Sequence, residues 1–228
     1  MTTVLVAGPD GELRTDCLPG ESWAAAAGRL AGDQAPLLQP VDLSGPDRRF
    51  AVCPDWRVQL RRATTGDLGD LVRWRQQPHV ARWWHADGEP TAERVHAQYL
   101  PEIEGGTPTT LSIIEVNGRS IGFLQDYPLA AYPEYALLTP EPDAIGLDYA
   151  IGQAEWTGRG FGVMALWAWV AECRRRFPQA PSAFAAPDHR NRASLRMLAK
   201  AGFVEGTWFD DPDGSTVVGC SLSLPQAR

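Results

Sequence analysis

A glycine-rich turn between an apolar strand and an apolar helix carries the strongest chemical signal in this 228-residue sequence. The strand covers residues 148–152, and the turn, Thr157–Gly162, has glycine at every second position. Glycine has no Cβ, so the N–H groups of the turn stay open to an anion, and the first N–H groups of the following helix lack partners. The pattern predicts that a pyrophosphate binds to the main chain here. The residues concerned are Gly158, Arg159, Gly160, Phe161, Gly162 and Val163.

The spacing of the glycines separates this turn from two other phosphate-binding loops. A dinucleotide-binding turn follows Gly-x-Gly-x-x-Gly, and here the third glycine, Gly162, comes one residue early. A P-loop ends in Gly-Lys-Ser or Gly-Lys-Thr, whereas this turn continues into Val163. The arrangement resembles the coenzyme A loop of the Gcn5-related N-acetyltransferases (the GNAT superfamily). The alternative is a plain strand-to-helix turn that binds no ligand.

A second stretch downstream adds to this resemblance. Residues 182–186 predict a strand, residues 187–191 a loop, and residues 192–201 a helix that Gly202 closes. Strand, loop, short helix and Ala-Gly-Phe are similar to the second half of the same acyltransferase signature. The resemblance implies that Asn191 and Ser194 contact coenzyme A. Taken alone, Asn191 is typical of an ordinary helix N-cap.

The resemblance also implies a role for the main chain of the strand before the turn. The amides of Tyr149, Ala150 and Ile151 are expected to hold the pantetheine arm and the thioester carbonyl of acetyl-CoA.

Asp148 is the residue that could act on an amine. It lies inside an otherwise apolar strand, Ile145–Ile151, where an acid must be paired, hydrogen-bonded or functional. An aliphatic amine with a pKa near 10 is about one part in a thousand neutral at pH 7, which costs roughly 4 kcal/mol when the neutral form must react. A carboxylate beside the amine can orient it and accept its proton. We therefore assign Asp148 as the catalytic residue; the alternative is an aspartate on the solvent side of the strand.

Further motifs make the resemblance more specific. Five short stretches occur in the order seen in the aminoglycoside 6′-N-acetyltransferases. They are His79–Trp84, Ala97–Pro101, Gly118–Gln125, Gly146–Asp148 and Asp211–Gly214. The resemblance implies acetyl-CoA as cofactor, an aminoglycoside as the cationic amine substrate, and Asp148 as the acid that acts on the amine.

The same resemblance implies an antibiotic-binding site. The residues that match it are Trp83, Tyr99, Gln125 and Asp213, and we also expect Trp84, Asp126 and Asp188 to bind the substrate. The residues themselves leave other interpretations open. Trp83 and Trp84 are about 100° apart on a helix, so one is expected in the core and the other at the rim. Tyr99 can be a core aromatic, Gln125 can pair across the sheet, and Asp213 can belong to a solvated acidic turn.

Two positions depart from this family. Many relatives carry a tyrosine in the short helix that protonates the departing thiolate, and Leu198 stands there in this chain. Water or Ser194 could supply the proton, or none is needed because a thiol has a pKa near 8.5. Relatives also carry an antibiotic-binding aspartate where this chain has Ala186, with Asp188 two residues on.

These departures leave two other functions open. The lysine N-acyltransferases of siderophore synthesis keep an acid at the position of Asp188 and also lack the tyrosine, but they usually have histidine where this chain has Asp148. The third possibility is a non-catalytic coenzyme A-binding module.

The elements that position these residues indicate an α/β domain with a mixed sheet over residues 56–228. The patterns predict a strand over 58–62, helices over 64–74, 79–84 and 91–100 with a stop at Pro101, a hairpin at Asn117-Gly118, and a loop over 128–143. The resemblance implies the GNAT fold, a mostly antiparallel sheet with one splayed parallel pair, flanked by helices. Residues 1–55 are expected to be an N-terminal extension, with a hairpin over 3–17, a short helix over 22–30 and an irregular segment over 36–54.

Composition limits the partners. The net charge of −7 argues against nucleic acid and suits a cationic substrate. The four cysteines have neither metal-ligand nor redox spacing, and neither a signal peptide nor a membrane-spanning run is predicted. We expect a cytoplasmic enzyme without a metal, either a monomer or a homodimer.

Overall fold

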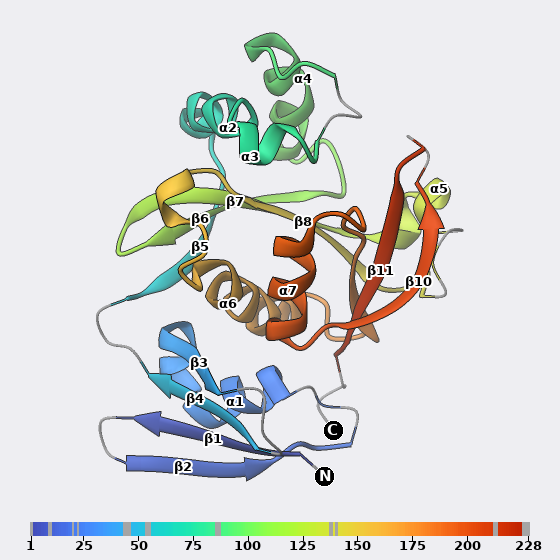
Figure 1. The fold of residues 1–228 in the computed structure, drawn as a ribbon. Helices are drawn as coiled ribbons and strands as arrows, with labels where there is room; N and C mark the ends of the chain where they lie inside the picture. Colours follow the sequence, from blue (N-terminus) through green and yellow to red (C-terminus); the bar gives the residue numbers. More distant parts are fainter. Residues whose placement is uncertain are drawn as a thin grey trace.

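The computed structural model describes residues 2–8, 11–19, 21, 23–42, 47–52, 56–84, 88–136, 139, 141–211 and 214–224. They form a four-stranded sheet, in the order β2-β1-β4-β3, and a seven-stranded sheet, in the order β10-β11-β9-β8-β7-β6-β5 (Figure 1). The larger sheet carries helices on both faces, as predicted for an α/β fold with a mixed sheet. In the described part of the chain, no helix is both long enough and apolar enough to cross a membrane.

The N-terminal segment folds as a sheet with its own helix. It comprises β1 (Thr3–Gly8), β2 (Gly11–Asp16), α1 (Trp23–Ala31), the 3₁₀ helix η1 (Gly32–Leu37), β3 (Leu38–Asp42) and β4 (Arg48–Val52). The predicted hairpin and helix are confirmed, but the prediction of an irregular segment over 36–54 is wrong, because β4 pairs with β1 in parallel and β3 pairs with β4. Pro40 is tolerated because β3 is an edge strand and its register shifts at that proline.

The larger sheet is antiparallel except for one pair of strands. Its strands are β5 (Val58–Arg62), β6 (Thr110–Val116), β7 (Arg119–Pro128), β8 (Ile145–Ile151), β9 (Ser182–Ala185), β10 (Val204–Asp210) and β11 (Thr216–Ser223). Asn117 and Gly118 both have positive φ in the two-residue turn between β6 and β7, which confirms the predicted hairpin. The parallel strands β8 and β9 pair only at Ile145↔Ala183 and Gly146↔Phe184. Beyond Gly146, β8 continues without β9 beside it, so this pair is splayed.

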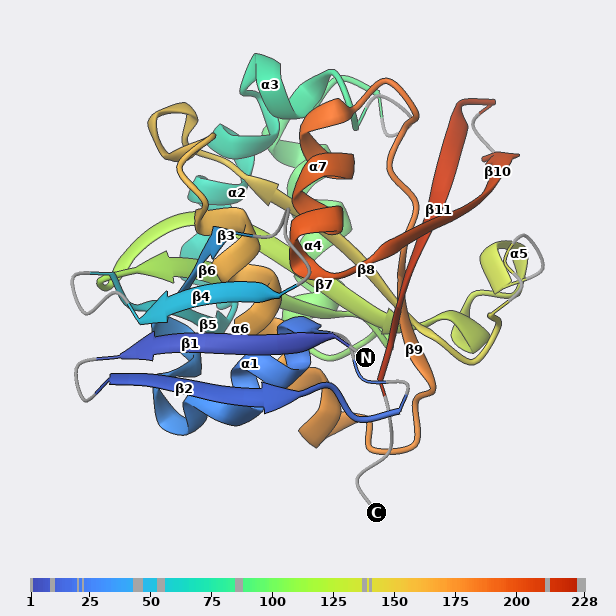
Figure 2. The ribbon, with the colours of Figure 1, turned by 60° about the horizontal axis from the view of Figure 1, so that its bottom comes forward.

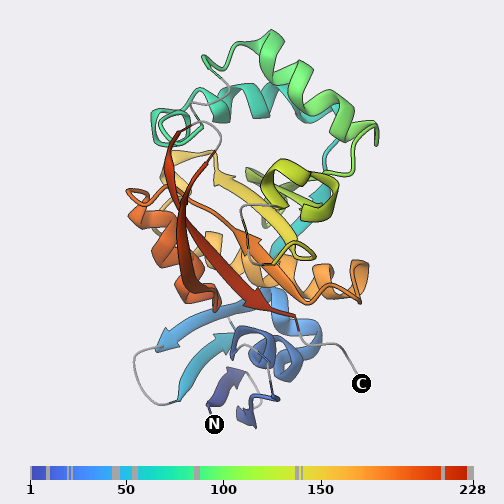
Figure 3. The same cartoon turned by 90° about the vertical axis from the view of Figure 1, so that its right-hand side faces the viewer.

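Helices cover the two faces of this sheet differently. The 3₁₀ helix η2 (Thr65–Asp67), α2 (Leu68–Arg75), α3 (Pro78–Ala81) and α4 (Ala92–Ile103) lie over one face, and α6 (Phe161–Arg176) lies on the other (Figure 1). The N-terminal sheet and α1 pack on the far side of α6, where Phe50 meets Trp167 edge to face at 4.8 Å between ring centroids (Figure 2). The molecule is therefore layered from α2–α4 through the large sheet and α6 to the N-terminal unit (Figure 3).

The remaining elements connect these layers. Three short helices, η3 (Leu129–Ala131), α5 (Pro133–Ala136) and η4 (Ala154–Trp156), lie in the connections on either side of β8, and the first two occupy the segment expected to be a loop. The helix α7 (Arg192–Ala201) has the predicted bounds, and Gly202 ends it in the left-handed conformation with φ of 98°. It packs on α6.

Helix α4 runs three residues further than predicted. Pro101 lies inside the helix instead of ending it, because a proline near a helix C-terminus removes a single backbone hydrogen bond. The buried residues Val95, Tyr99 and Glu102 recur at helical spacing and hold this last turn against the sheet. The extension matters because it places Glu102 on the inner face of the helix.

Candidate active site

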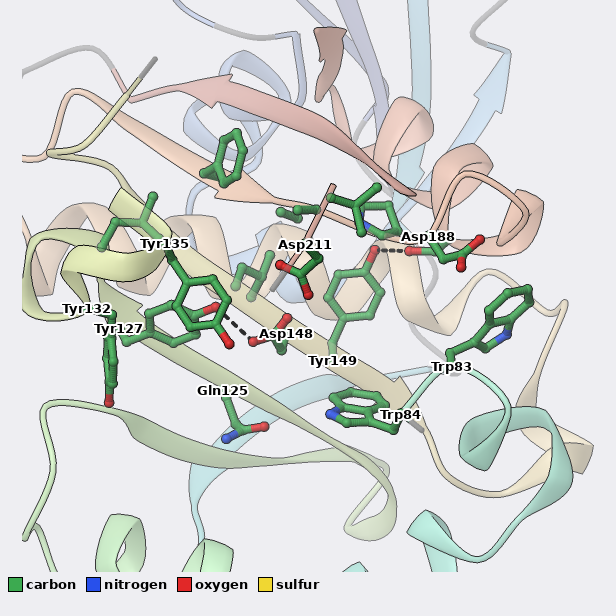
Figure 4. A pocket seen from close by; sticks show the side chains of 18 of the residues that line it. Trp83, Trp84, Gln125, Tyr127, Tyr132, Tyr135, Asp148, Tyr149, Asp188 and Asp211 are labelled. Carbon is green, nitrogen blue, oxygen red and sulfur yellow. Dashed lines mark hydrogen bonds between the residues drawn. The ribbon is translucent and has the colours of Figure 1, made fainter. Parts of the chain in front are cut away.

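A cavity of about 410 Å³ opens where β8 and β9 part (Figure 4). Its walls come from the residues that follow α3, from α4, from β7 to β9, from the segment around α5, from α7 and from the β10–β11 hairpin. It therefore lies at the point where most of the predicted site residues were expected to meet.

Asp148, the residue predicted to be catalytic, lies in the wall of this cavity. Its neighbour on β7 in the antiparallel register is Gln125, so both side chains lie on the same face of the sheet. The Tyr127 hydroxyl donates a hydrogen bond to Asp148 Oδ2 at 2.9 Å (Figure 4). This bond restrains the carboxylate in the cavity wall, and a carboxylate has several lone pairs that can each accept a hydrogen bond.

A second carboxylate in the cavity wall, Glu102, was missed by sequence reasoning. Its side chain is 8% exposed, and Gln125 Nε2 donates to both of its oxygens at 2.9 and 3.0 Å. Burial raises the pKa of Glu102 to about 7, and the negative charge of Asp148 acts in the same direction. A carboxylic acid with a raised pKa in a cavity is a signal of function.

The charged side chains in the described lining of the cavity are acidic. The carboxylates that line it belong to Glu102, Asp148, Asp188 and Asp211, and the described lining residues include neither lysine nor arginine. Asp188 has a counter-ion nearby, because Arg190 binds both of its oxygens at 2.6 and 2.9 Å and lowers the pKa of that carboxyl. The arrangement suits a ligand that carries several positive charges.

A pair of hydroxyl groups lies on the α7 side of the cavity. Tyr149 Oη and Ser194 Oγ are 2.6 Å apart, and both residues line the cavity. One O–H is used between the two groups, which leaves the other O–H for a third partner. Leu198, one turn further along α7, is 0% exposed and packs in the core. Asn191 also lines the cavity, and its side chain accepts a hydrogen bond from the Ser194 N–H as the N-cap of α7.

The glycine turn lies at the N-terminus of α6, as predicted. Gly158 and Gly160 have φ of 71° and 86°, a conformation that other residues rarely adopt, and a Cβ on either would meet open space. Arg159 lies over the rings of Trp156 and Phe161 at 5.3 and 5.5 Å, which holds a guanidinium group beside the turn. Positive charge, two left-handed glycines and a helix N-terminus form an anion-binding donor set.

The third glycine of the turn also has a packing role. A Cβ on Gly162 would collide with the Met197 side chain of α7, so Gly162 permits close packing of α6 against α7. The main chain of Tyr149, Ala150 and Ile151 lies on the part of β8 that β9 leaves unpaired, as expected for a segment that must bind a ligand. The Ile151 carbonyl is the exception, because the His79 ring lies 2.8 Å from it.

The structure brings together most of the residues predicted to bind the substrate. Trp83, Trp84, Gln125 and Asp188 line the cavity. Trp84 packs against Phe123, and Trp83 lies beneath the Arg82 guanidinium, so Trp84 is the more core-like of the pair. Asp213 lies outside the described residues.

Two predicted substrate-binding residues are in the wrong place for that role. Tyr99 is 0% exposed and packs edge to face on Phe123, and its hydroxyl accepts a hydrogen bond from Arg75 at 2.7 Å. Asp126 follows Gln125 on β7 and therefore points to the opposite face, toward α6, where it is 0% exposed and bound by Arg176 and Trp169. Neither residue lines the cavity.

Comparison with known proteins agrees with this fold. A family model described as "Acetyltransferase (GNAT) domain" matches residues 63–211. The aminoglycoside N(6′)-acetyltransferase type 1 of Klebsiella pneumoniae is 30% identical over 162 residues, which covers 70% of this chain and 80% of that protein. The lysine N-acyltransferase MbtK of Mycobacterium tuberculosis is 31% identical over 165 residues, with coverage of 71% and 77%.

Solved structures match over the same region. The crystal structure of the aminoglycoside acetyltransferase AAC(6′)-Ib with coenzyme A has a TM-score of 0.65 and 28% identity, and the match covers 73% of this chain and 94% of that chain. The same enzyme with coenzyme A and kanamycin matches equally well. The chain therefore belongs to the GNAT family of acetyltransferases.

Proposed function

We propose that this protein transfers the acetyl group of acetyl-CoA to an amine of an aminoglycoside, and that it acts in the cytoplasm. The observation that carries the proposal is the cavity itself, where an oriented carboxylate, Asp148, lies among other acids at the splayed end of β8. The relatives named as aminoglycoside acetyltransferases, and the neighbour solved with coenzyme A and kanamycin, support the same acceptor.

The residues present fit coenzyme A. Gly158, Gly160 and the N-terminus of α6, with Arg159 beside them, would hold the pyrophosphate, and the unpaired main chain of β8 after Gly146 would hold the pantetheine arm. Acetyl-CoA supplies the activated acetyl group. The protein binds and orients the two substrates, accepts the proton of the amine and offers an O–H to the departing sulfur.

Asp148 orients the amine and accepts its proton as the new C–N bond forms. Tyr127 fixes the carboxylate for this step through its hydroxyl. The C–S bond breaks in the same exchange, and the Tyr149–Ser194 pair offers its free O–H to the departing sulfur. This pair takes the place of the tyrosine that relatives carry where this chain has Leu198.

A second function follows from the lysine N-acyltransferase relatives, which match with similar identity and coverage. An acidic cavity accommodates a lysine derivative as well, since that substrate also presents an amine.

An assay of thiol release from acetyl-CoA across several acceptors separates these functions. Kanamycin, ribostamycin, a polyamine and an N-hydroxylated lysine derivative are compared at equal concentrations, and a longer acyl-CoA is tested with each. We expect kanamycin or ribostamycin to give the highest kcat/KM with acetyl-CoA. Preference for the lysine derivative with the longer acyl group would assign the second function, and no release with any acceptor would refute both.

A further inference from the structure

The side chain of Gln125 contacts one carboxylate of the cavity wall, and a second carboxylate belongs to its neighbour on the next strand. Its Nε2 contacts both oxygens of Glu102, and its cross-strand neighbour on β8 is Asp148. Figure 4 shows Gln125 and Asp148 on neighbouring strands at the cavity. The three residues come from α4, β7 and β8 and converge on one place.

The chemistry of these groups fixes how the amide is turned. An ionised carboxylate can only accept hydrogen bonds, so the NH₂ group of Gln125 must face Glu102. The carbonyl oxygen of Gln125 is thereby directed away from Glu102, on the face of the sheet that carries Asp148. An ammonium group has three N–H donors and can bond to more than one acceptor at once.

We propose that Glu102 is a positioning residue that fixes the Gln125 amide, so that the Gln125 carbonyl and the Asp148 carboxylate together bind the ammonium group of the substrate. The inference rests on the proposed function, and it adds a specificity element. The pair of acceptors selects a protonated amine over a neutral hydroxyl at the same position, because a protonated amine forms charge-assisted bonds with both.

The ionisation of Glu102 gives this arrangement a pH dependence. Burial places the pKa of Glu102 near 7, and Asp148 on β8 is the charged group that raises it further. The other ionisable side chains that line the cavity are Tyr127, Tyr132, Tyr135, Tyr149, Asp188 and Asp211. Arg75 of α2 is bonded to Gln98 and Tyr99 of α4. Protonated Glu102 has an O–H that can donate to the Gln125 carbonyl, which removes the reason for the amide to face one way.

The first test is calorimetric binding of kanamycin at pH 8 to the wild type and to Glu102→Gln. The substituted side chain can offer either a carbonyl or an NH₂ group, so it no longer fixes Gln125. We expect about a tenfold weaker affinity, the size of one hydrogen bond to a charged group. Glu104→Gln, an exposed acid two residues further along the chain, is the matched control and should bind as the wild type does.

A double-mutant cycle tests whether Glu102 acts through Gln125. In the background of Gln125→Met, which has no carbonyl to orient, Glu102→Gln should cause no further loss of affinity. A full tenfold loss in that background would show that Glu102 contacts the substrate directly and would overturn the proposal. Glu102→Leu repeats the cycle without an amide at position 102.

The pH dependence of kanamycin binding is a further test, because a purely structural role of Glu102 predicts no change with pH. The ratio of wild-type to Glu102→Gln affinity cancels the titration of the ligand amines. It should approach one as the pH falls from 8 through about 7, where Glu102 gains its proton. A constant ratio would overturn the proposal. Absence of kanamycin binding by the wild type would instead refute the proposed function, so the two failures are distinguishable.

Discussion

Two buried carboxylates near β7 show how differently the same chemical group is used in this molecule. Asp126 points toward α6 and is bound by two nitrogens of Arg176 and by Trp169, at 2.7 to 3.0 Å. Glu102 approaches the other face of the strand and accepts hydrogen bonds from a neutral amide, that of Gln125. The negative charge of Asp126 is balanced by Arg176, so this carboxylate stabilises the fold. Glu102 has a neutral partner, so its ionised form destabilises the fold, and its carboxylate can act on a ligand instead.

The comparison extends to the neighbouring residues of each face. Asp148 and Gln125 lie on the Glu102 side, at a cavity whose described lining also includes Asp188 and Asp211, while the α6 side is packed with apolar residues around the ion pair of Arg176 and Asp126. Because successive residues of a strand point to opposite faces, one position along β7 separates a candidate substrate contact from a structural one. The following predictions test this division.

Asp148→Asn should have the largest effect, on activity. Loss of the group that accepts the amine proton should reduce kcat for acetyl transfer by about 10² to 10⁴. The melting temperature should change little, because Asp148 is only half-buried. Steady-state kinetics with kanamycin, together with thermal unfolding, measure both quantities. Unchanged kcat would remove Asp148 from the mechanism.

Asp126→Asn should have its main effect on stability. The substitution leaves the Arg176 guanidinium without its full counter-charge and should lower the free energy of unfolding by about 3 kcal/mol. The kcat of the folded fraction should stay within a factor of two or so of the wild-type value, because Asp126 does not line the cavity. Urea unfolding measures the first quantity. A stable but inactive variant would contradict the assignment of Asp126 to the fold.

Glu102→Gln should change stability in the opposite direction. The pKa of Glu102 is raised from 4.5 to about 7 on folding, so its contribution is fully present below pH 4.5 and is lost as the pH rises through 7. At pH 8 the variant should be more stable than the wild type by about 3 kcal/mol, and the difference should disappear near pH 4.5. Denaturant unfolding at several pH values provides the measurement. A variant less stable at pH 8 would mean that Glu102 is compensated after all.

Ser194→Ala should have the smallest effect of the four, on the departure of the thiolate. The substitution removes one of the two hydroxyls that share a hydrogen bond, and kcat should fall by about tenfold while KM for the amine is unchanged. Tyr149→Phe should reduce kcat to a similar degree, and the double variant should lose little more, because the two groups act as a unit. Fully additive losses would show that they act separately.

Much of this architecture could be predicted from local sequence signals. The Asn117-Gly118 turn, the bounds of α7 and the glycine turn before α6 are each set by residues close together in the chain. The strands β3 and β4 could not be predicted in that way, since β4 pairs with β1, more than forty residues earlier, and β3 pairs with β4.

The site shows the same limit. Asp148 and Gln125 could be placed because they occur in recognisable motifs. Glu102 was missed because a proline before it predicted the end of the helix, and the packing of Tyr99 and Glu102 against the sheet overrides that local preference. Asp126 was assigned to the cavity although it directly follows Gln125, and alternation along the strand could have excluded it.

The most direct test of the account is the identity of the product formed from kanamycin and acetyl-CoA. After incubation with the wild-type protein, mass spectrometry and NMR should show one acetyl group on one amine of kanamycin, and reactions without acetyl-CoA should show none. Unmodified kanamycin, in the presence of a protein that demonstrably binds acetyl-CoA, would contradict the central claim that this acidic cavity acetylates a cationic amine.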